Sequence, residues 1–74
     1  SPHFGISTGR YKLIRFYTRV SGWELFDLEK DPSEMKNIYG QKGYEKVTAD
    51  LKKKLAQLID QYEDEEAKKI LVIH

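Results

Sequence analysis

The hydrophobic pattern of the second half of the chain most strongly limits the folds that it can adopt. From residue 44 onward, apolar residues recur every three or four positions, with lysines and acids between them. They are Tyr44, Val47, Leu51, Leu55, Leu58, Ile59 and Tyr62. This period predicts an amphipathic helix over about residues 43–63, about 30 Å long. Its apolar stripe could serve a coiled coil, but about two to three heptads are marginal for one, so we expect the stripe to be buried on another element.

The first half of the chain supplies the sheet that such a helix needs. β-Favouring residues predict strands over about residues 3–8, 11–17 and 23–28, with Gly9 at the first turn and residues 18–22 as a hairpin loop. The sequence therefore predicts an α+β fold, in which one long C-terminal amphipathic helix covers a small antiparallel sheet of three to four strands. With 74 residues, the chain is expected to form a single domain over residues 1–74.

A helix-capping pattern stands between the last predicted strand and the long helix. The Asp31 carboxylate can accept backbone N–H groups at a helix start, and Pro32 suits the first helical position. Glu34 completes a variant of the capping box, and Asn37 is predicted to end the turn in a left-handed conformation. We therefore predict a short turn of helix over residues 32–36, with these four residues specifying the fold.

The end of the chain carries a short run of β-favouring residues, from Ile70 to Ile73. This run predicts a final strand over residues 70–73, which completes the sheet or adds to the edge of a neighbouring one. A frayed tail is the alternative. The run is far too short to span a bilayer, so no membrane segment is predicted.

Residue types that usually carry catalysis or hold metals are sparse. The chain has no cysteine, and its two histidines, His3 and His74, lie near opposite ends without the spacing of a metal site. The glycines form no phosphate loop, and no serine has a histidine and a carboxylate partner in sequence. Calcium binding by Asp27, Glu29 and Asp31 would lack the glycine and the terminal glutamate of a calcium loop. We therefore predict no catalytic residue, no metal site and no cofactor in this chain.

Two sequence motifs, with a fixed spacing between them, carry a family resemblance. The first is Arg10-Tyr11-Lys12-Leu13-Ile14, and the second is Trp23-Glu24-Leu25-Phe26-Asp27-Leu28, followed by Asp31-Pro32. In this order they resemble the C-terminal part of the sulfatases, and the resemblance covers roughly Phe4 to Tyr62. It implies a subdomain with a four-stranded antiparallel sheet and a C-terminal helix, docked on a large α/β catalytic domain. The family is often secreted, periplasmic or lysosomal, and the sequence itself gives no location.

The resemblance implies that the parent enzyme hydrolyses sulfate esters. The family uses a formylglycine, made from the Cys or Ser of a C/S-x-P-x-R motif, and a calcium ion. This chain contains no such motif, so none of those residues can be assigned here. The chain is expected to be a non-catalytic accessory subdomain that completes the parent fold. Its expected partner is the catalytic domain, and the isolated fragment is expected to self-associate through the surface left bare.

The resemblance also suggests residues at the rim of the substrate cleft. In some sulfatases this subdomain borders the cleft, and basic groups hold sulfate through charge-assisted hydrogen bonds. His3, Arg10 and Lys12 are the candidates for contact with an anionic substrate. Alternatively, Arg10 and Lys12 are solvated strand residues that pair with the acidic return strand. Two departures from the family pattern stand beside this: Ser7 replaces a common arginine, and the apolar run from Ile70 is unusual.

Two rival functions belong to another class. Aromatic residues interleaved with basic ones can stack the bases of single-stranded RNA on a sheet. Such a platform would consist of Tyr11, Phe16, Tyr17 and Trp23 with Arg10, Lys12 and Arg15. A net charge of only +1 argues against nucleic acid. The second rival is a module that binds a protein partner through the helix stripe or the edge of residues 70–73.

Overall fold

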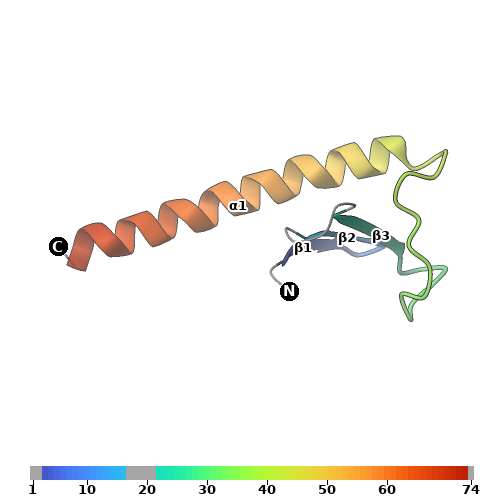
Figure 1. Ribbon diagram of the computed structural model, residues 1–74, viewed down its shortest axis with the longest axis horizontal. Helices are drawn as coiled ribbons and strands as arrows, with labels where there is room; N and C mark the ends of the chain where they lie inside the picture. The colour runs from blue at the N-terminus through green and yellow to red at the C-terminus, as the bar shows by residue number, and fades with distance from the viewer. Residues whose placement is uncertain (1–2, 17–21, 74) are drawn as a thin grey trace.

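The computed structural model describes residues 3–16 and 22–73, with side chains as far as residue 66. In these residues it contains three strands and one helix: β1 (His3–Thr8), β2 (Tyr11–Phe16), β3 (Trp23–Asp27) and α1 (Glu45–Ile73). The strands form one antiparallel sheet in the order β1-β2-β3, and α1 lies along one of its faces (Figure 1). The predicted α+β fold, a small antiparallel sheet under one long C-terminal helix, is confirmed.

The register of the strands divides their side chains between two faces. Leu13 of β2 pairs with Leu25 of β3 and with Ile6 of β1, on the face that α1 covers. The neighbouring positions point the other way, because successive side chains in a strand alternate. We call this second face, which α1 does not cover, the open face. It is formed by His3, Lys12, Ile14, Phe16, Glu24 and Phe26.

The core lies between the sheet and the first half of α1. Leu13 and Leu25 are fully buried, and Leu51 of α1, in the same cluster, is 2% exposed. Ile38, from the segment that leads to the helix, completes this cluster. Burial of each leucine side chain contributes about 1.5–3 kcal/mol. The helix stripe is therefore buried on the sheet, as the sequence predicts, over this half of α1.

The strands end within one residue of their predicted limits. β1 has the predicted limits, β2 is described from Tyr11 to Phe16, and β3 ends at Asp27, one residue earlier than predicted. Tyr17 and most of the hairpin loop predicted over residues 18–22 lie outside the described residues. Gly22, the last residue of that loop, accepts a hydrogen bond at its carbonyl from Phe16 N at 2.6 Å.

The limits of α1 differ from the prediction at both ends. The helix begins at Glu45, after Gly43, whose φ of 97° favours glycine. The Glu45 carboxylate accepts a hydrogen bond from Gly43 N at 2.7 Å. At the other end the strand predicted over residues 70–73 is wrong, because α1 continues to Ile73. No glycine or proline follows Gly43, and residues 63–69 are mostly strong helix formers, so nothing in the sequence ends the helix before the apolar run.

Residues 32–36 form no turn of helix, so that prediction is wrong as well. Glu34 N donates to the Asp31 carbonyl at 3.0 Å and closes a single turn, after which Glu34 adopts a φ of 54°. This left-handed conformation reverses the chain where a helix would have continued. Among the residues that the structure describes, Glu34 is the only non-glycine residue with a positive φ. The left-handed conformation predicted for Asn37 therefore occurs three residues earlier.

Candidate functional site

The turn between β1 and β2 carries an arginine, Arg10, whose side chain forms an ion pair within the chain. Gly9 adopts a φ of 67°, and Arg10 follows it with its carbonyl accepting from Leu28 N at 2.6 Å. The Arg10 guanidinium reaches across to Asp27 at the end of β3. It donates from Nε to Oδ1 at 3.2 Å and from Nη2 to Oδ2 at 3.0 Å. Such a two-point contact fixes the planar guanidinium in one orientation.

The Asp27 carboxylate is the one buried charged group among the described residues, with 4% exposure. Besides Arg10, it accepts hydrogen bonds from Glu29 N at 3.2 Å and from Lys30 N at 3.3 Å. The bond from Arg10 lowers the pKa of Asp27 below its ordinary value, although burial opposes the shift. The same pairing raises the pKa of Arg10. Both charges are therefore satisfied within the chain, as expected if Arg10 pairs with the acidic return strand.

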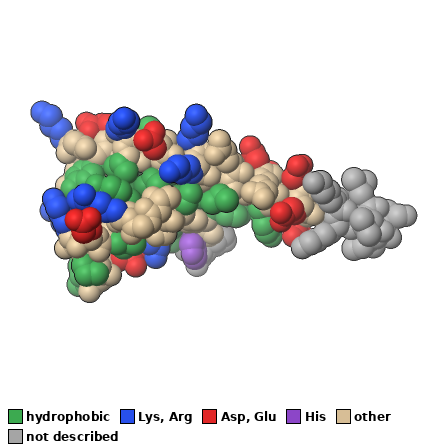
Figure 2. Space-filling model, turned by 180° about the vertical axis from the view of Figure 1, so that it is seen from behind, with side chains coloured by type: hydrophobic (Ala, Val, Ile, Leu, Met, Phe, Trp, Pro, Cys, Tyr) green, Lys and Arg blue, Asp and Glu red, His purple; other side chains and the backbone are tan. Residues whose placement is uncertain are grey.

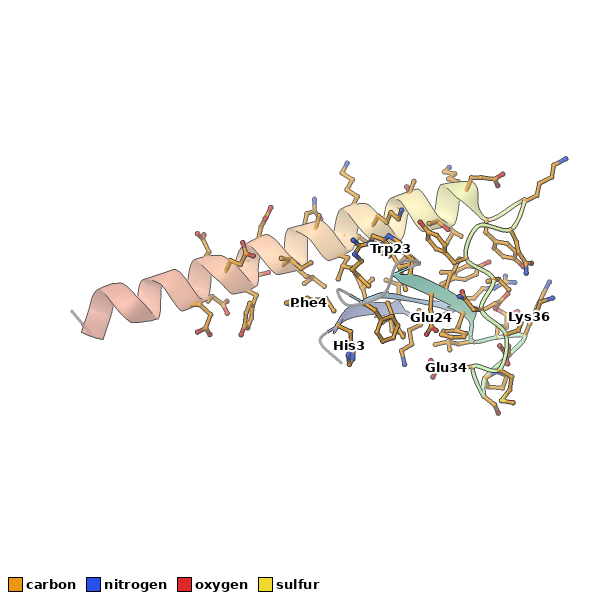
Figure 3. The ribbon with its side chains drawn as sticks, viewed as in Figure 1. His3, Phe4, Trp23, Glu24, Glu34 and Lys36 are labelled. Carbon is orange, nitrogen blue, oxygen red and sulfur yellow. The ribbon has the colours of Figure 1, made fainter. Side chains whose placement is uncertain are left out.

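The other two predicted cleft residues lie on the open face. Lys12 Nζ is 2.9 Å from Glu34 Oε1, an ion pair in which both side chains are about one-third exposed. His3 lies at the opposite end of the sheet, where its ring centroid is 5.5 Å from that of Phe16 (Figure 3). Phe16, the partner of His3, lies four positions along β2 from Lys12, a distance of about 13 Å. The structure therefore does not bring His3, Arg10 and Lys12 together, and their role at a cleft stays a prediction.

The segment after β3 runs along the outer edge of that strand and satisfies its backbone. Asn37 Oδ1 accepts from Leu25 N at 3.0 Å, and Asn37 Nδ2 donates to the Trp23 carbonyl at 3.4 Å. Ile38 N donates to the Leu25 carbonyl at 2.9 Å. The asparagine side chain thus acts as a short piece of an additional strand. We call this arrangement the Asn37 edge.

The Asp31 carboxylate organises the loop of residues 31–36. It accepts from Met35 N at 3.0 Å and from Lys36 N at 3.0 Å, and the Asp31 backbone N donates to the Asp27 carbonyl at 2.8 Å. These donors lie four and five residues beyond Asp31, further along than the donors of a helix cap. Asp31 and Asn37 therefore do make the local backbone contacts that a fold-specifying role requires, with partners different from those predicted. That role stays a prediction, for them and for Pro32 and Glu34.

The aromatic residues of the hypothetical RNA platform are largely packed beneath α1. Trp23 stacks on Tyr39 with ring centroids 5.9 Å apart and an interplanar angle of 8°. The Nζ atom of Lys52, on α1, lies 4.4 Å from the centroid of the Trp23 ring and donates to the Tyr39 hydroxyl at 2.6 Å. Tyr11 meets Tyr44 edge to face at 6.3 Å. Three rings of the platform therefore already have partners in the chain, since Phe16 meets His3 on the open face, and Tyr17 lies outside the described residues.

Sequence reasoning missed the parts of this cluster that come from outside the strands. Tyr39 follows the capping pattern. Lys52 lies beside the apolar stripe, at a position where the sequence predicts a solvated side chain. Their contact with Trp23 depends on the path of the chain between β3 and α1. The spacing of aromatic and basic residues along the chain does not predict this contact, because the contact joins residues far apart in sequence.

A pocket of about 240 Å³ lies beside the Asp27 turn. Its walls come from Asp27, Lys30, Asp31, Lys36, Ile38, Gln41 and Tyr44. The two carboxylates in this wall already accept hydrogen bonds from Arg10 and from the backbone. Within residues 3–16 and 22–66, no group of three histidine or acidic side chains lies close enough together to hold a metal ion. No described helix has the length and apolar character needed to cross a membrane.

Comparisons with known proteins give consistent matches. The sequence profile of the family described as "N-sulphoglucosamine sulphohydrolase, C-terminal" matches residues 1–61. The N-acetylglucosamine-6-O-sulfatase of Bacteroides thetaiotaomicron is 42% identical over 62 residues, which are 84% of this chain and 11% of that protein. The solved structure of BT4656 in complex with its substrate D-glucosamine-2-N,6-O-disulfate superposes with a TM-score of 0.76 and 42% identity. That superposition covers 84% of this chain and 13% of the solved one, so the chain spans only a small part of either relative.

Proposed function

Because the chain belongs to the N-sulphoglucosamine sulphohydrolase C-terminal family, we propose that it is a non-catalytic accessory subdomain of a sulfatase, an enzyme that hydrolyses sulfate esters. The observation that carries this proposal is the match of most of the chain to a small part of a sulfatase. The subdomain completes the fold of the parent protein, and its partner is the catalytic domain.

The chemistry of the described residues favours a structural role over a catalytic one. The buried carboxylate, Asp27, is held ionised by Arg10, so it is unsuited to exchange a proton near neutral pH. The calcium ion and the formylglycine that the family resemblance implies do not fit here. The sequence lacks the formylglycine motif, and the described side chains form no metal cluster. In our proposal both cofactors belong to the catalytic domain.

The proposal predicts the outcome of an exchange with the Bacteroides sulfatase. The isolated chain should not hydrolyse a sulfate ester. A chimera in which the chain replaces the matching segment of that enzyme should turn over its substrate within about tenfold of the parent rate, because no catalytic group is exchanged. The parent enzyme with the segment deleted serves as the control and should be inactive or insoluble. Hydrolysis by the isolated chain, or a soluble and folded chimera without activity, would refute the accessory role.

The proposal also predicts how the isolated chain behaves in solution. Without its partner, the open face leaves Ile14 and Phe16 only half-buried. Apolar surface of this kind favours association. Sedimentation velocity over a range of concentrations should therefore show reversible self-association. A chain that remains monomeric at the highest concentration would contradict this prediction.

A further inference from the structure

We propose that the open face of the sheet, together with the loop that carries Met35, is the surface on which the catalytic domain of a sulfatase docks. The proposal rests on the accessory role above and names the surface through which that role is exercised. Its occupant is the large domain of the same enzyme.

The two outward surfaces of the molecule differ in chemistry. The outer side of α1 carries charged and polar residues, which suit solvent. They are Lys46, Asp50, Lys53, Gln57, Asp60 and Asp64. Lysine and acidic side chains project along the helix in the space-filling view as well (Figure 2). The open face instead carries Ile14 and Phe16, both partly exposed, next to Glu24 and Lys12, while Phe26 on the same face is only 7% exposed. Partly exposed apolar residues with charged neighbours are typical of an interface between domains.

The loop of residues 31–36 extends this surface and exposes a single large apolar side chain. Met35 is 83% exposed, more than any other large hydrophobic residue that the structure describes. The ion pair between Lys12 and Glu34 ties the loop to the open face. Glu34 lies on the side of the sheet away from α1, as does His3 (Figure 3). The residue that precedes Met35 is therefore joined to the open face.

The backbone around Met35 is fixed before any partner arrives. Both oxygens of the Asp31 carboxylate hold N–H groups of residues 35 and 36. Glu34 is held at a φ of 54°, a conformation that non-glycine residues seldom adopt. A loop ordered in advance loses little entropy when it docks. Methionine adapts its shape to a partner surface and is common at interfaces. An exposed methionine on a rigid loop is thus suited to act as an anchor.

The relatives indicate the size and kind of the occupant. This chain superposes on 13% of the solved chain at a TM-score of 0.76, so most of that protein lies outside the region of similarity. A domain much larger than this one is therefore joined to the same fold. The sheet offers it one broad face, because α1 already covers the other. A second copy of this chain is the competing occupant, and the experiment separates the two.

The test uses the fact that Met35 is the only methionine in the chain. The isolated chain, kept dilute, and the chimera with the Bacteroides sulfatase are treated with hydrogen peroxide, and sulfoxide at Met35 is followed by peptide mass spectrometry. Oxidation of Met35 should be at least about tenfold slower in the chimera, because the reaction follows exposure of the sulfur. Equal rates in the two samples would overturn the proposal. Protection that depends only on the concentration of the isolated chain would assign the surface to a second copy and overturn it too.

A pair of matched variants adds a second readout. Met35→Lys should lower the temperature at which the chimera loses activity, while the unfolding of the isolated chain stays unchanged. Leu58→Lys places the same charge at another exposed apolar residue, on α1, and should affect both samples alike. An active chimera with unprotected Met35 would refute the docking surface and leave the accessory role intact. An inactive chimera with protected Met35 would support the docking surface and refute the accessory role.

Discussion

Replacing Asp27 with alanine is expected to lower the midpoint of thermal unfolding of the chain by about 10 °C or more. The carboxylate is buried, and it joins the end of β3 to the β1–β2 turn through Arg10. Its removal also leaves two backbone N–H groups, those of Glu29 and Lys30, without their acceptor. Groups that lose a buried partner account for the largest effects of single substitutions. Thermal unfolding followed by far-ultraviolet circular dichroism measures the difference.

The pH dependence of this effect follows from the pKa of Asp27. The folded chain holds that pKa below the ordinary value of about 3.9. The ionised carboxylate therefore stabilises the fold above the unfolded pKa, and the contribution is lost as the pH falls through the lower, folded value. The difference between the original chain and Asp27→Ala should be constant near neutral pH and should shrink below about pH 4.

Glu29 provides the control for the Asp27 experiment. Its carboxylate also approaches Arg10, at 3.6 Å, but its side chain is 68% exposed. Water screens exposed ion pairs, so Glu29→Gln should shift the midpoint by no more than about 3 °C. Equal shifts for Asp27→Ala and Glu29→Gln would show that the buried pair has no special role. Asp27→Asn should fall between them, because the amide keeps an acceptor for the backbone and loses the charge.

Replacing Asn37 with alanine is expected to cost about 2–3 kcal/mol of unfolding free energy. The side chain makes one contact with Leu25 N, one with the Trp23 carbonyl, and a third with Tyr39 N at 3.0 Å. Alanine supports none of them, and the N–H of the fully buried Leu25 is left without an acceptor. Unfolding in urea, with circular dichroism as the readout, gives the free energy directly.

The control for Asn37 is an exposed amide in the same connecting segment. Gln41 is exposed, and its backbone makes the turn contacts with Ile38 and Tyr44. Gln41→Ala should change the unfolding free energy by no more than about 0.5 kcal/mol. If Asn37→Ala falls within the same range, the Asn37 edge contributes nothing to stability. Asn37→Asp should be intermediate, since it keeps the acceptor and loses the donor.

The parts of the fold that depend on neighbouring residues could be predicted from the sequence. β-Favouring residues located the three strands, and the apolar stripe located α1. The run from Ile70 to Ile73 was misjudged, because its β propensity is weaker than the continuation of a helix that nothing interrupts. Propensity describes each residue alone, whereas a helix gains a hydrogen bond for every residue added.

The contacts of the candidate site depend on register and could not be predicted in detail. The acidic character of the return strand suggested a partner for Arg10, but the choice of Asp27 required the pairing of Tyr11 with Asp27. The residues of the capping pattern were recognised as a group. Their partners were not, because Asn37 contacts a strand twelve residues earlier and Glu34 contacts Lys12. Local motifs indicate which residues make structural contacts, and only the three-dimensional path of the chain shows which partners they contact.

The Asn37 edge has a consequence for how copies of this chain can polymerise. A strand whose outward amide and carbonyl groups are already occupied offers no template to an incoming strand. The carbonyl groups of Trp23 and Asp27 and both backbone groups of Leu25 are occupied in this way, so the outer edge of β3 is a poor template for an incoming strand. Substituting Asn37 would free the Leu25 N–H and the Trp23 carbonyl, and would make this edge more accessible to a strand of another copy.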